Sequence, residues 1–369
     1  MDQDAFEAVL PEVSRRVPRV ILGTWPTPVE SLDLPGVAVP CHVKREDLSA
    51  PPYGGNKVRC LEPVFADAIE RGVRRVWATG AYGSNQAVAM ATHAPTVGLD
   101  CGAILFPQPS TATARANLRA LATTGCDLQL TRSLLTFPLA LARQLWRRGE
   151  ADQIVPPGAA IPLGALGHVT AALEVALEVA RGALPPPAHV VLPVGSTCTS
   201  AGLLVGFALA ARLGVGFQGS APTIHSVRIS PWPVTARFRI VGLAQRTARL
   251  LHSLGGPDVS DALTSREALV TAGGLTGGGY GKPSAPGLAA KARFAEVGAP
   301  ALDTTYSAKA AAHLLGGMTP SGPVLFWSTK SSAPLQEPSE DQVARLPARG
   351  QRWLAHPHRL DPPERGPQN

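Results

Sequence analysis

Apolar residues recur along this chain at two alternating spacings, one typical of helices and one typical of buried strands. In LEPVFADAIERG (61–72), Leu61, Val64 and Phe65 fall on one helix face, whereas HVVLPV (189–194) is a short apolar run rich in valine. The same criteria predict helices at 61–72, 85–94, 112–125, 137–149, 165–183, 201–214 and 235–255. They predict strands at 73–80, 101–106, 126–130, 189–194 and 223–229.

The order of these elements predicts the fold class. Strands that alternate with crossover helices form parallel sheets covered by helices on both faces. Two such series are separated by a stretch rich in proline and glycine, IVPPGAAIPLGALG (154–167), so we expect two α/β units. Residues 334–369 are rich in proline and charge and lack periodicity, which predicts a tail that is disordered or packed against a partner subunit.

Composition and charge narrow the function classes. Hydrophobic residues make up 45% and charged residues 17% of the 369 residues, which is typical of a globular protein. The net charge of +7 comes from scattered arginines rather than a basic run, so we expect no nucleic-acid partner. The five cysteines are widely spaced without a CxxC pair, and we expect neither a disulfide scaffold nor a metal site. We find no signal-peptide core and no apolar run of membrane-spanning length, which predicts a cytoplasmic protein with no membrane partner.

Two glycine-containing loops mark a candidate ligand site. TGAYGSNQ (79–86) and PVGSTCTSAG (193–202) each follow a predicted strand and open a predicted helix. Ligands of parallel α/β proteins collect at the carboxyl ends of strands, and the free N–H groups of a helix start bind anions. The second loop is rich in hydroxyls and contains neither GxxxxGK[ST] nor GxGxxG, so we expect a phosphate monoester rather than a nucleotide.

The segment PPYGGNKVRC (51–60) places Lys57 directly behind two glycines and an asparagine. Alone, this pattern is typical of a surface turn. A lysine on a flexible turn, a Ser-Asn loop at a helix start and a hydroxyl-rich phosphate loop together describe a pyridoxal phosphate site. In such a site the lysine forms a Schiff base with the cofactor and the loop holds its phosphate.

Six motifs in order resemble the fold-type II pyridoxal phosphate enzymes, and in particular the 1-aminocyclopropane-1-carboxylate deaminase and D-cysteine desulfhydrase family. The resemblance covers roughly residues 20–330. The motifs are VKREDLS–GGNKVR, GAYGSNQ, VGSTCTSAGLLVGF, GGGYGKPSAPG, LDTTYSAKAAAHLL and VLFWSTK. The resemblance implies two parallel-sheet α/β domains, tryptophan synthase beta-like, with the cofactor in the cleft between them. It implies a large domain (1–43 and 165–333), a small domain (44–164), a small amino-acid substrate and a homodimer.

The resemblance also implies roles for individual residues. Lys57 would hold the cofactor and then act as the proton-transfer base, and Asn85 would hydrogen-bond the ring hydroxyl. Ser84 and Gln86 would meet the substrate carboxylate, although simple helix capping also accounts for Ser84. Tyr280 and Tyr306 would face the substrate as catalytic residues, although either also fits a protein core. The remaining expected cofactor contacts are Gly195, Ser196, Thr197, Cys198 (through its backbone), Thr199, Ser307 and Thr329.

The reaction type depends on Ser307. The deaminase branch of the family carries a carboxylate there, which keeps the pyridine nitrogen protonated, and a neutral serine cannot do this. Ser307 therefore favours a desulfhydrase-like α,β-elimination through an aminoacrylate to a keto acid and ammonia. The alternatives are ring opening of the deaminase type, a β-replacement transferase and a non-catalytic homologue that binds the cofactor.

Three departures from the family pattern surround the expected site. Cys60 replaces a lysine that would reach the phosphate, which costs cofactor affinity unless Arg59 or another group compensates. Lys330 and Ser331 replace small residues beside the ring. Pro95 interrupts a helix that the family keeps intact. These changes predict an altered substrate.

Overall fold

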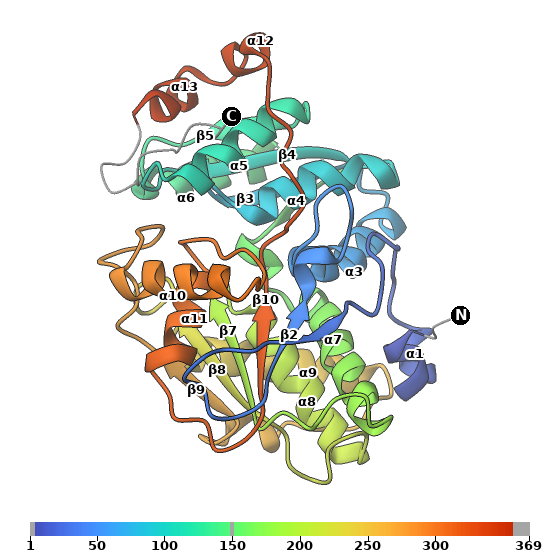
Figure 1. The fold of residues 1–369 in the computed structure, drawn as a ribbon. Helices are drawn as coiled ribbons and strands as arrows, with labels where there is room; N and C mark the ends of the chain where they lie inside the picture. Colours follow the sequence, from blue (N-terminus) through green and yellow to red (C-terminus); the bar gives the residue numbers. More distant parts are fainter. Residues whose placement is uncertain (1–3, 148–150, 357–369) are drawn as a thin grey trace.

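The computed structural model describes residues 4–147 and 151–356, which form two α/β domains, each built on its own sheet (Figure 1). The large sheet has the strand order β1-β2-β10-β7-β8-β9 and the small sheet the order β5-β4-β3-β6. The large-sheet strands are Val29–Ser31, Cys41–Arg45, Val324–Ser328, His189–Val194, Thr223–Arg228 and Leu269–Ala272. The small-sheet strands are Asp127–Leu130, Asp100–Phe106, Arg75–Ala81 and Asp152–Val155.

Helices cover both faces of each sheet. The helices of the large domain are α1 (Ala5–Val9), α2 (Pro11–Ser14), α7 (Pro162–Ala180), α8 (Cys198–Leu213), α9 (Arg237–Ser253), α10 (Ala285–Glu296) and α11 (Ser307–Gly316). Those of the small domain are α3 (Lys57–Glu70), α4 (Asn85–His93), α5 (Ala112–Thr123) and α6 (Phe137–Arg147). Two further helices, α12 (Glu340–Ala344) and α13 (Ala348–Ala355), follow the last strand.

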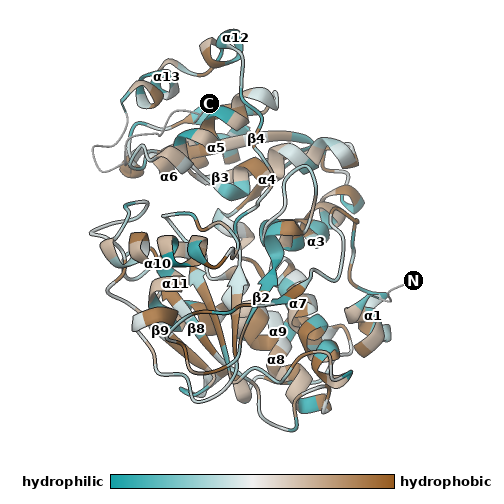
Figure 2. Ribbon diagram, viewed as in Figure 1, coloured by the Kyte–Doolittle hydropathy of each residue, from teal (hydrophilic) through white to brown (hydrophobic). Residues whose placement is uncertain are grey.

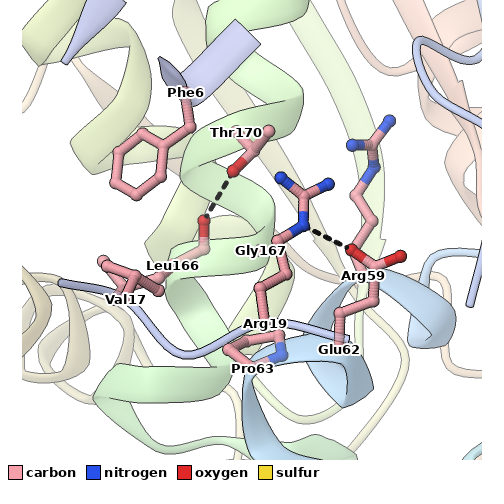
Figure 3. A pocket seen from close by; sticks show the side chains of 9 residues that line it. All are labelled: Phe6, Val17, Arg19, Arg59, Glu62, Pro63, Leu166, Gly167 and Thr170. Atoms are coloured by element: carbon pink, nitrogen blue, oxygen red, sulfur yellow. Dashed lines mark hydrogen bonds and ion pairs between the residues drawn. The ribbon is translucent and has the colours of Figure 1, made fainter. Parts of the chain in front are cut away.

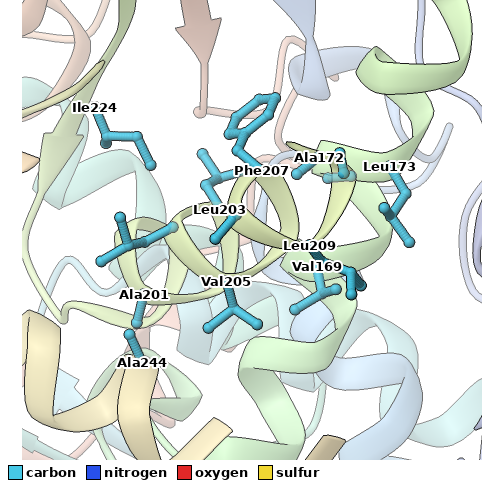
Figure 4. Close-up of a cluster of buried hydrophobic side chains, with 14 of the residues drawn as sticks. Val169, Ala172, Leu173, Ala201, Leu203, Val205, Phe207, Leu209, Ile224 and Ala244 are labelled. Carbon is cyan, nitrogen blue, oxygen red and sulfur yellow. The ribbon is translucent and has the colours of Figure 1, made fainter. Parts of the chain in front are cut away.

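The central strand β7 explains why its sequence is a continuous apolar run. Val190 and Leu192 pack into the core beneath α7, α8 and α9, whereas Val191 packs into the core beneath α10 and α11. Successive side chains of a strand point to opposite faces, so a sheet covered on both faces requires apolar residues at every position. Figure 2 shows β8 and β9 as predominantly hydrophobic, and Figure 4 shows Val169 of α7 and Leu203 and Phe207 of α8 within one cluster of buried side chains.

The predicted fold class is confirmed, with one addition. All neighbouring strands in both sheets pair in parallel except β1, which pairs antiparallel with β2 at the edge of the large sheet. The strands β1, β2, β6 and β9 were not predicted because they are short or carry polar and charged residues, whereas β10 (VLFWS) is an apolar run that the same criteria could have identified. Strand β2 continues to Arg45, so the large-domain sheet extends beyond the expected boundary at residue 43.

One sequence-based expectation was wrong. Residues 334–356 are not disordered: Trp353 stacks edge-on against Tyr82 of the small domain at 5.4 Å and donates from Nε1 to the carbonyl of Gln108. Residues 357–369 of the tail lie outside the described part of the chain. The helix α7 is long and apolar enough to cross a membrane by length and composition, although 67% of its apolar window is buried inside the protein, as in a core helix.

Candidate active site

A cavity of about 620 Å³ lies between the two domains, where strands of both sheets end. Its walls include the segments that follow β3, β6, β7, β8 and β10, together with the start of α3. This location is the one where parallel α/β proteins bind ligands. Most of the expected site residues line it: Lys57, Ser84, Asn85, Gln86, Gly195, Ser196, Thr197, Thr199, Tyr280, Tyr306 and Thr329.

Lys57 is the first residue of α3, and the turn before it explains the two glycines. Gly55 has φ +92°, and a Cβ there would lie 2.8 Å from the carbonyl oxygen of Thr329. The turn is fixed on both sides, because Gly55 N donates to the carbonyl of Glu46 at 2.8 Å and Asn56 N donates to that of Thr329 at 3.1 Å. Within the described residues, Lys57 Nζ makes no hydrogen bond or ion pair. The turn therefore presents an unengaged amine to the cavity.

The loop between β7 and α8 forms a cradle for an anion. Thr197, the N-cap of the 16-residue helix α8, has φ +71°, so the chain turns sharply and leaves the first N–H groups of the helix without intrahelical partners. A Cβ at Gly195 would lie 3.2 Å from the Tyr306 ring, so a larger residue would narrow the cavity there. Cys198 directs its Sγ to the carbonyl of Ala159 at 3.1 Å, which leaves only its backbone for a ligand.

Asn85 is oriented by its neighbours. Asn117 donates from Nδ2 to the carbonyl of Gly83 at 2.9 Å and from the same nitrogen to Asn85 Oδ1 at 2.7 Å. Tyr53 also donates to Asn85 Oδ1, at 3.2 Å. The amide oxygen is thus fully engaged, and the Nδ2 group of Asn85 remains as a donor at the cavity wall. This is the polarity that a ring hydroxyl or its anion requires.

The neighbours of Asn85 differ in how far their side chains are available. Ser84 caps α4 by accepting from the Ala87 N–H at 3.2 Å, so the capping role is real, and its hydroxyl proton stays free within the described structure. Gln86 accepts from the Gly158 N–H and donates to the carbonyl of Pro156 at 3.1 Å. Because both ends of its amide are engaged, Gln86 holds the 156–158 segment in place, and its contact with a substrate carboxylate stays a prediction.

Tyr280 and Tyr306 meet in the cavity, with their hydroxyl oxygens 2.6 Å apart. Burial raises the pKa of Tyr306 well above its usual range, with further contributions from Tyr280 and Asp303, and burial also raises the pKa of Tyr280. Both hydroxyls therefore stay protonated at neutral pH, and one of them donates to the other. The pair is a proton donor rather than a base.

The sequence did not predict a role for Asp303, which fixes the backbone around Tyr306. Its buried carboxylate accepts from the N–H groups of Thr305 at 3.0 Å, Tyr306 at 2.9 Å and Ser307 at 3.0 Å, and from Ser307 Oγ at 2.8 Å. Ser307 is thus committed to Asp303, is 1% exposed and is absent from the cavity wall. Its contact with a ring nitrogen stays a prediction. No sequence signal distinguishes Asp303 from any other acidic residue before a turn.

Two further residues tie the lysine turn to the anion cradle. Asn56 donates from Nδ2 to Thr199 Oγ1 at 2.8 Å, and His168 Nε2 lies 3.3 Å from the same oxygen. His168 is fully buried, and burial, followed by Lys57 and Arg59, lowers its pKa well below its usual range, so the imidazole is neutral. These contacts join residues distant in sequence, which no local pattern could reveal.

Arg59 does not compensate for Cys60. Its guanidinium donates to Glu46 at 2.6 Å and to Glu174 at 2.7 Å and lies 3.9 Å above the Trp25 ring. Figure 3 shows it at a separate small cavity of about 20 Å³ beside Arg19 and Glu62. Among the described residues that line the large cavity, Lys57 is the only charged one, so N–H groups and hydroxyls must hold an anion there.

These features fit pyridoxal 5′-phosphate. The unengaged amine of Lys57 can bond to its aldehyde, the 195–199 cradle suits its phosphate and the Nδ2 group of Asn85 suits its ring oxygen.

Comparisons with known proteins point the same way. The model of the family described as "Pyridoxal-phosphate dependent enzyme" matches residues 20–329. The chain is 35% identical over 324 residues to Nocardicin C-9' epimerase of Nocardia uniformis subsp. tsuyamanensis, covering 86% of this chain and 93% of that protein. It is 31% identical over 333 residues to D-cysteine desulfhydrase of Salmonella paratyphi A, covering 85% and 94%.

Solved structures agree on the fold. The structure described as the ACC deaminase homologue matches with a TM-score of 0.70 at 24% identity, covering 90% of this chain and 96% of that one. A solved threonine deaminase matches with a TM-score of 0.56 at 17% identity, covering 90% and 98%.

Proposed function

Because the chain belongs to the family of pyridoxal-phosphate dependent enzymes, we propose that it catalyses α,β-elimination on an amino acid, giving a keto acid and ammonia. The family brings its cofactor, pyridoxal 5′-phosphate, and the lyase and deaminase chemistry of its members. The observation that carries the proposal is a base and an acid in one cavity: the unengaged Lys57 amine and the protonated Tyr280–Tyr306 pair. An α,β-elimination needs both, one at the α-carbon and one at the leaving group.

When bound, pyridoxal 5′-phosphate supplies an aldehyde for amines and an electron sink for the α-carbon of an attached amino acid. Lys57 would hold the cofactor through its aldehyde, and its Nζ would take the proton from the α-carbon of the substrate. Tyr306 holds a proton on its hydroxyl oxygen for the group that leaves the β-carbon, and Tyr280 keeps that hydroxyl in place at 2.6 Å.

Binding and orientation fall to the two helix starts. The first-turn N–H groups of α8 and the hydroxyls of Ser196, Thr197 and Thr199 bind the phosphate. Ser84 and the first-turn N–H groups of α4 bind the substrate carboxylate. Asn85 donates to the ring oxygen and so fixes the plane of the cofactor.

Ser307 supports elimination rather than ring opening. It is neutral and hydrogen-bonded to Asp303, so it supplies no carboxylate at the position where the deaminase branch has one. The relative at 31% identity is named a D-cysteine desulfhydrase, an activity that also removes a group from the β-carbon.

A second candidate is epimerisation at the α-carbon. The 35% identical relative is named Nocardicin C-9' epimerase. The same residues could serve this reaction, because inversion begins with removal of the α-proton, for which Lys57 is the base. It ends with the return of a proton by a donor such as Tyr306.

The two reactions separate in one experiment. The purified holoenzyme is incubated in D₂O with each enantiomer of cysteine and β-chloroalanine, and with 1-aminocyclopropane-1-carboxylate. Elimination predicts pyruvate and ammonia, whereas ring opening predicts 2-oxobutyrate from the cyclopropane substrate. Recovery of inverted, α-deuterated amino acid without keto acid would instead establish the epimerase. Incorporation of an added thiol would establish a β-replacement transferase.

A homodimer and a cytoplasmic location are part of the same proposal. Size-exclusion chromatography with light scattering and cell fractionation test them directly.

A further inference from the structure

The cavity has two chemically different walls. The inner wall carries Lys57, Asn85, the hydroxyl cradle and the tyrosine pair, which the proposed reaction uses. The outer wall, here called the apolar mouth, consists of Phe106, Leu134, Phe137, Trp232 and Val234. The proposed reaction gives these five residues no task.

The two walls come from different connections of the fold. On the inner wall, the 195–199 cradle follows β7, Asn85 follows β3 and Tyr280 follows β9. On the apolar mouth, Trp232 and Val234 come after β8, Phe106 ends β4, and Leu134 comes after β5. The large domain contributes Trp232 and Val234 and the small domain contributes Phe106, Leu134 and Phe137, so both domains form the mouth.

Three of the five residues of the mouth are strongly exposed, whereas Phe137 is 9% exposed and packs in a core cluster with Trp77 and Ile104. Trp232 is 70% exposed, Leu134 is 62% exposed and Val234 is 47% exposed. No charged side chain of the described structure lines this part of the cavity, because Lys57 on the inner wall is the only charged residue of the lining. Clustered, exposed apolar side chains on the walls of a cavity are typical of a binding site for an apolar group.

The cavity has room for the cofactor together with a substrate. Its volume of about 620 Å³ lies in the range of sites that hold ligands the size of a drug molecule. The cofactor and the carboxylate, amine and β-carbon of a substrate are all met by inner-wall groups. The apolar mouth would stay in contact with water if the substrate ended at its β-substituent.

We propose that the substrate is an amino acid with a bulky, uncharged aromatic group beyond its β-carbon, held in the apolar mouth between Trp232 of the large domain and Phe106 and Leu134 of the small domain. The proposal rests on the proposed function for the reaction at the α- and β-carbons. The mouth itself determines specificity and takes no part in the chemistry.

A pair of substrates tests this directly, since cysteine and S-benzylcysteine share the same α- and β-carbons. Elimination from S-benzylcysteine breaks the Cα–H and Cβ–S bonds and releases benzyl mercaptan, and one water molecule then hydrolyses the remaining three-carbon enamine to pyruvate and ammonia. Cysteine releases hydrogen sulfide instead of the mercaptan. Both enantiomers of each are used with the holoenzyme, and pyruvate is measured. We expect kcat/KM to favour S-benzylcysteine by about 10-fold or more, the discrimination that an apolar pocket provides.

Variants locate the effect. Trp232→Ala is expected to lower the preference for S-benzylcysteine over cysteine by about 10-fold. Leu134→Ala, on the opposite domain, is expected to lower it in the same direction and serves if the tryptophan variant fails to fold. Trp146→Ala is the matched control, because Trp146 is 85% exposed on α6 but lies outside the cavity, and it should leave both activities unchanged.

A binding measurement keeps this inference separate from the reaction. The change in cofactor absorbance on adding each amino acid gives an apparent Kd without requiring keto acid. If no substrate gives pyruvate, the proposed elimination is wrong. If S-benzylcysteine still binds about 10-fold more tightly than cysteine, and Trp232→Ala loses this preference, the role of the apolar mouth in binding is supported. Equal or tighter binding of cysteine, or an unchanged preference in both variants, would contradict the proposal that the apolar mouth binds the substrate. This holds whichever reaction the enzyme catalyses.

Discussion

Lys57 and Arg59 are two residues apart at the start of α3, yet their side chains lie in opposite surroundings. Lys57 faces the large cavity, and its Nζ has no partner in the described structure. Arg59 is 2% exposed and is held by Glu46, Glu174 and the Trp25 ring, next to Lys44, which donates to Glu174 at 2.9 Å. The difference teaches that partners, rather than residue type, decide whether a cation on this helix is structural or reactive.

The largest expected effect comes from removing the reactive lysine, Lys57. Lys57→Ala should lower turnover by about 10³-fold or more, since it removes both the attachment point and the base. The thermal stability of the cofactor-free protein should stay close to wild type, because Lys57 Nζ has no partner among the described residues. Steady-state keto acid formation and thermal unfolding measure the two effects. A variant with substantial turnover would show that another residue is the base.

Arg59→Met removes the structural cation of the pair. It leaves Glu46 and Glu174 buried without their main counter-charge, and we expect it to lower the free energy of unfolding by about 3–5 kcal/mol. Arg71→Met at the end of the same helix is the matched control, because its pairing with Asp67 is solvent-exposed, and we expect a loss of no more than about 0.5 kcal/mol. Equal losses in the two variants, measured by urea unfolding, would contradict the comparison.

A cluster of three histidines in the large domain extends the comparison, because no ion pair is found for any of them within residues 4–147 and 151–356. His225 lies 3.2 Å from both His189 and His313, and His189 also contacts Ser321 at 3.3 Å. Burial, followed by His313 and His189, lowers the pKa of His225 from 6.5 to about 4. The folded protein therefore binds fewer protons than the unfolded chain, and the stability that His225 contributes above pH 6.5 is lost as the pH falls from about 6.5 to 4.

We expect this loss to be about 2 kcal/mol after allowance for partial exposure of the ring to solvent. His225→Gln should flatten the pH dependence of the unfolding free energy in that window, whereas His252→Gln, at an exposed position, should not. If His225→Gln leaves the slope of unfolding free energy against pH unchanged, folding does not lower the pKa of His225.

The smallest effect concerns the link between the lysine turn and the anion cradle. Thr199→Val removes the hydroxyl that Asn56 bonds and that lines the cavity, and we expect cofactor affinity to fall by roughly 10-fold. Thr199→Ser keeps the hydroxyl and should bind the cofactor like wild type. Titration of the cofactor-free protein, followed by absorbance, separates them, and equal affinities would remove Thr199 from the site.

Sequence patterns predicted the helices and strands in which apolar residues recur at a regular spacing. The helices and strands around β3, β4, β7 and β8 have continuous apolar patterns, and Lys57 and the 195–199 loop stand at strand and helix ends with glycines and hydroxyls beside them. The short strands β1, β2 and β9 lack such patterns. The packing of α13 depends on Trp353 meeting Tyr82, a contact between residues far apart in sequence.

The supporting residues of the site could not be predicted for the same reason. Asp303, Asn117 and His168 act through contacts with Ser307, Asn85 and Thr199, and these exist only after folding. The side-chain direction of Arg59 also follows from tertiary structure, because both carboxylates that hold it come from other elements.

The central claim is that the amine of Lys57, rather than any other lysine, carries pyridoxal 5′-phosphate. Borohydride reduction of the holoenzyme, followed by proteolysis and mass spectrometry of the peptides, tests it most directly. The account predicts a single phosphopyridoxyl modification, on Lys57, and loss of the visible absorbance. A modification on Lys44, Lys309 or Lys330 instead, or none at all, would contradict it.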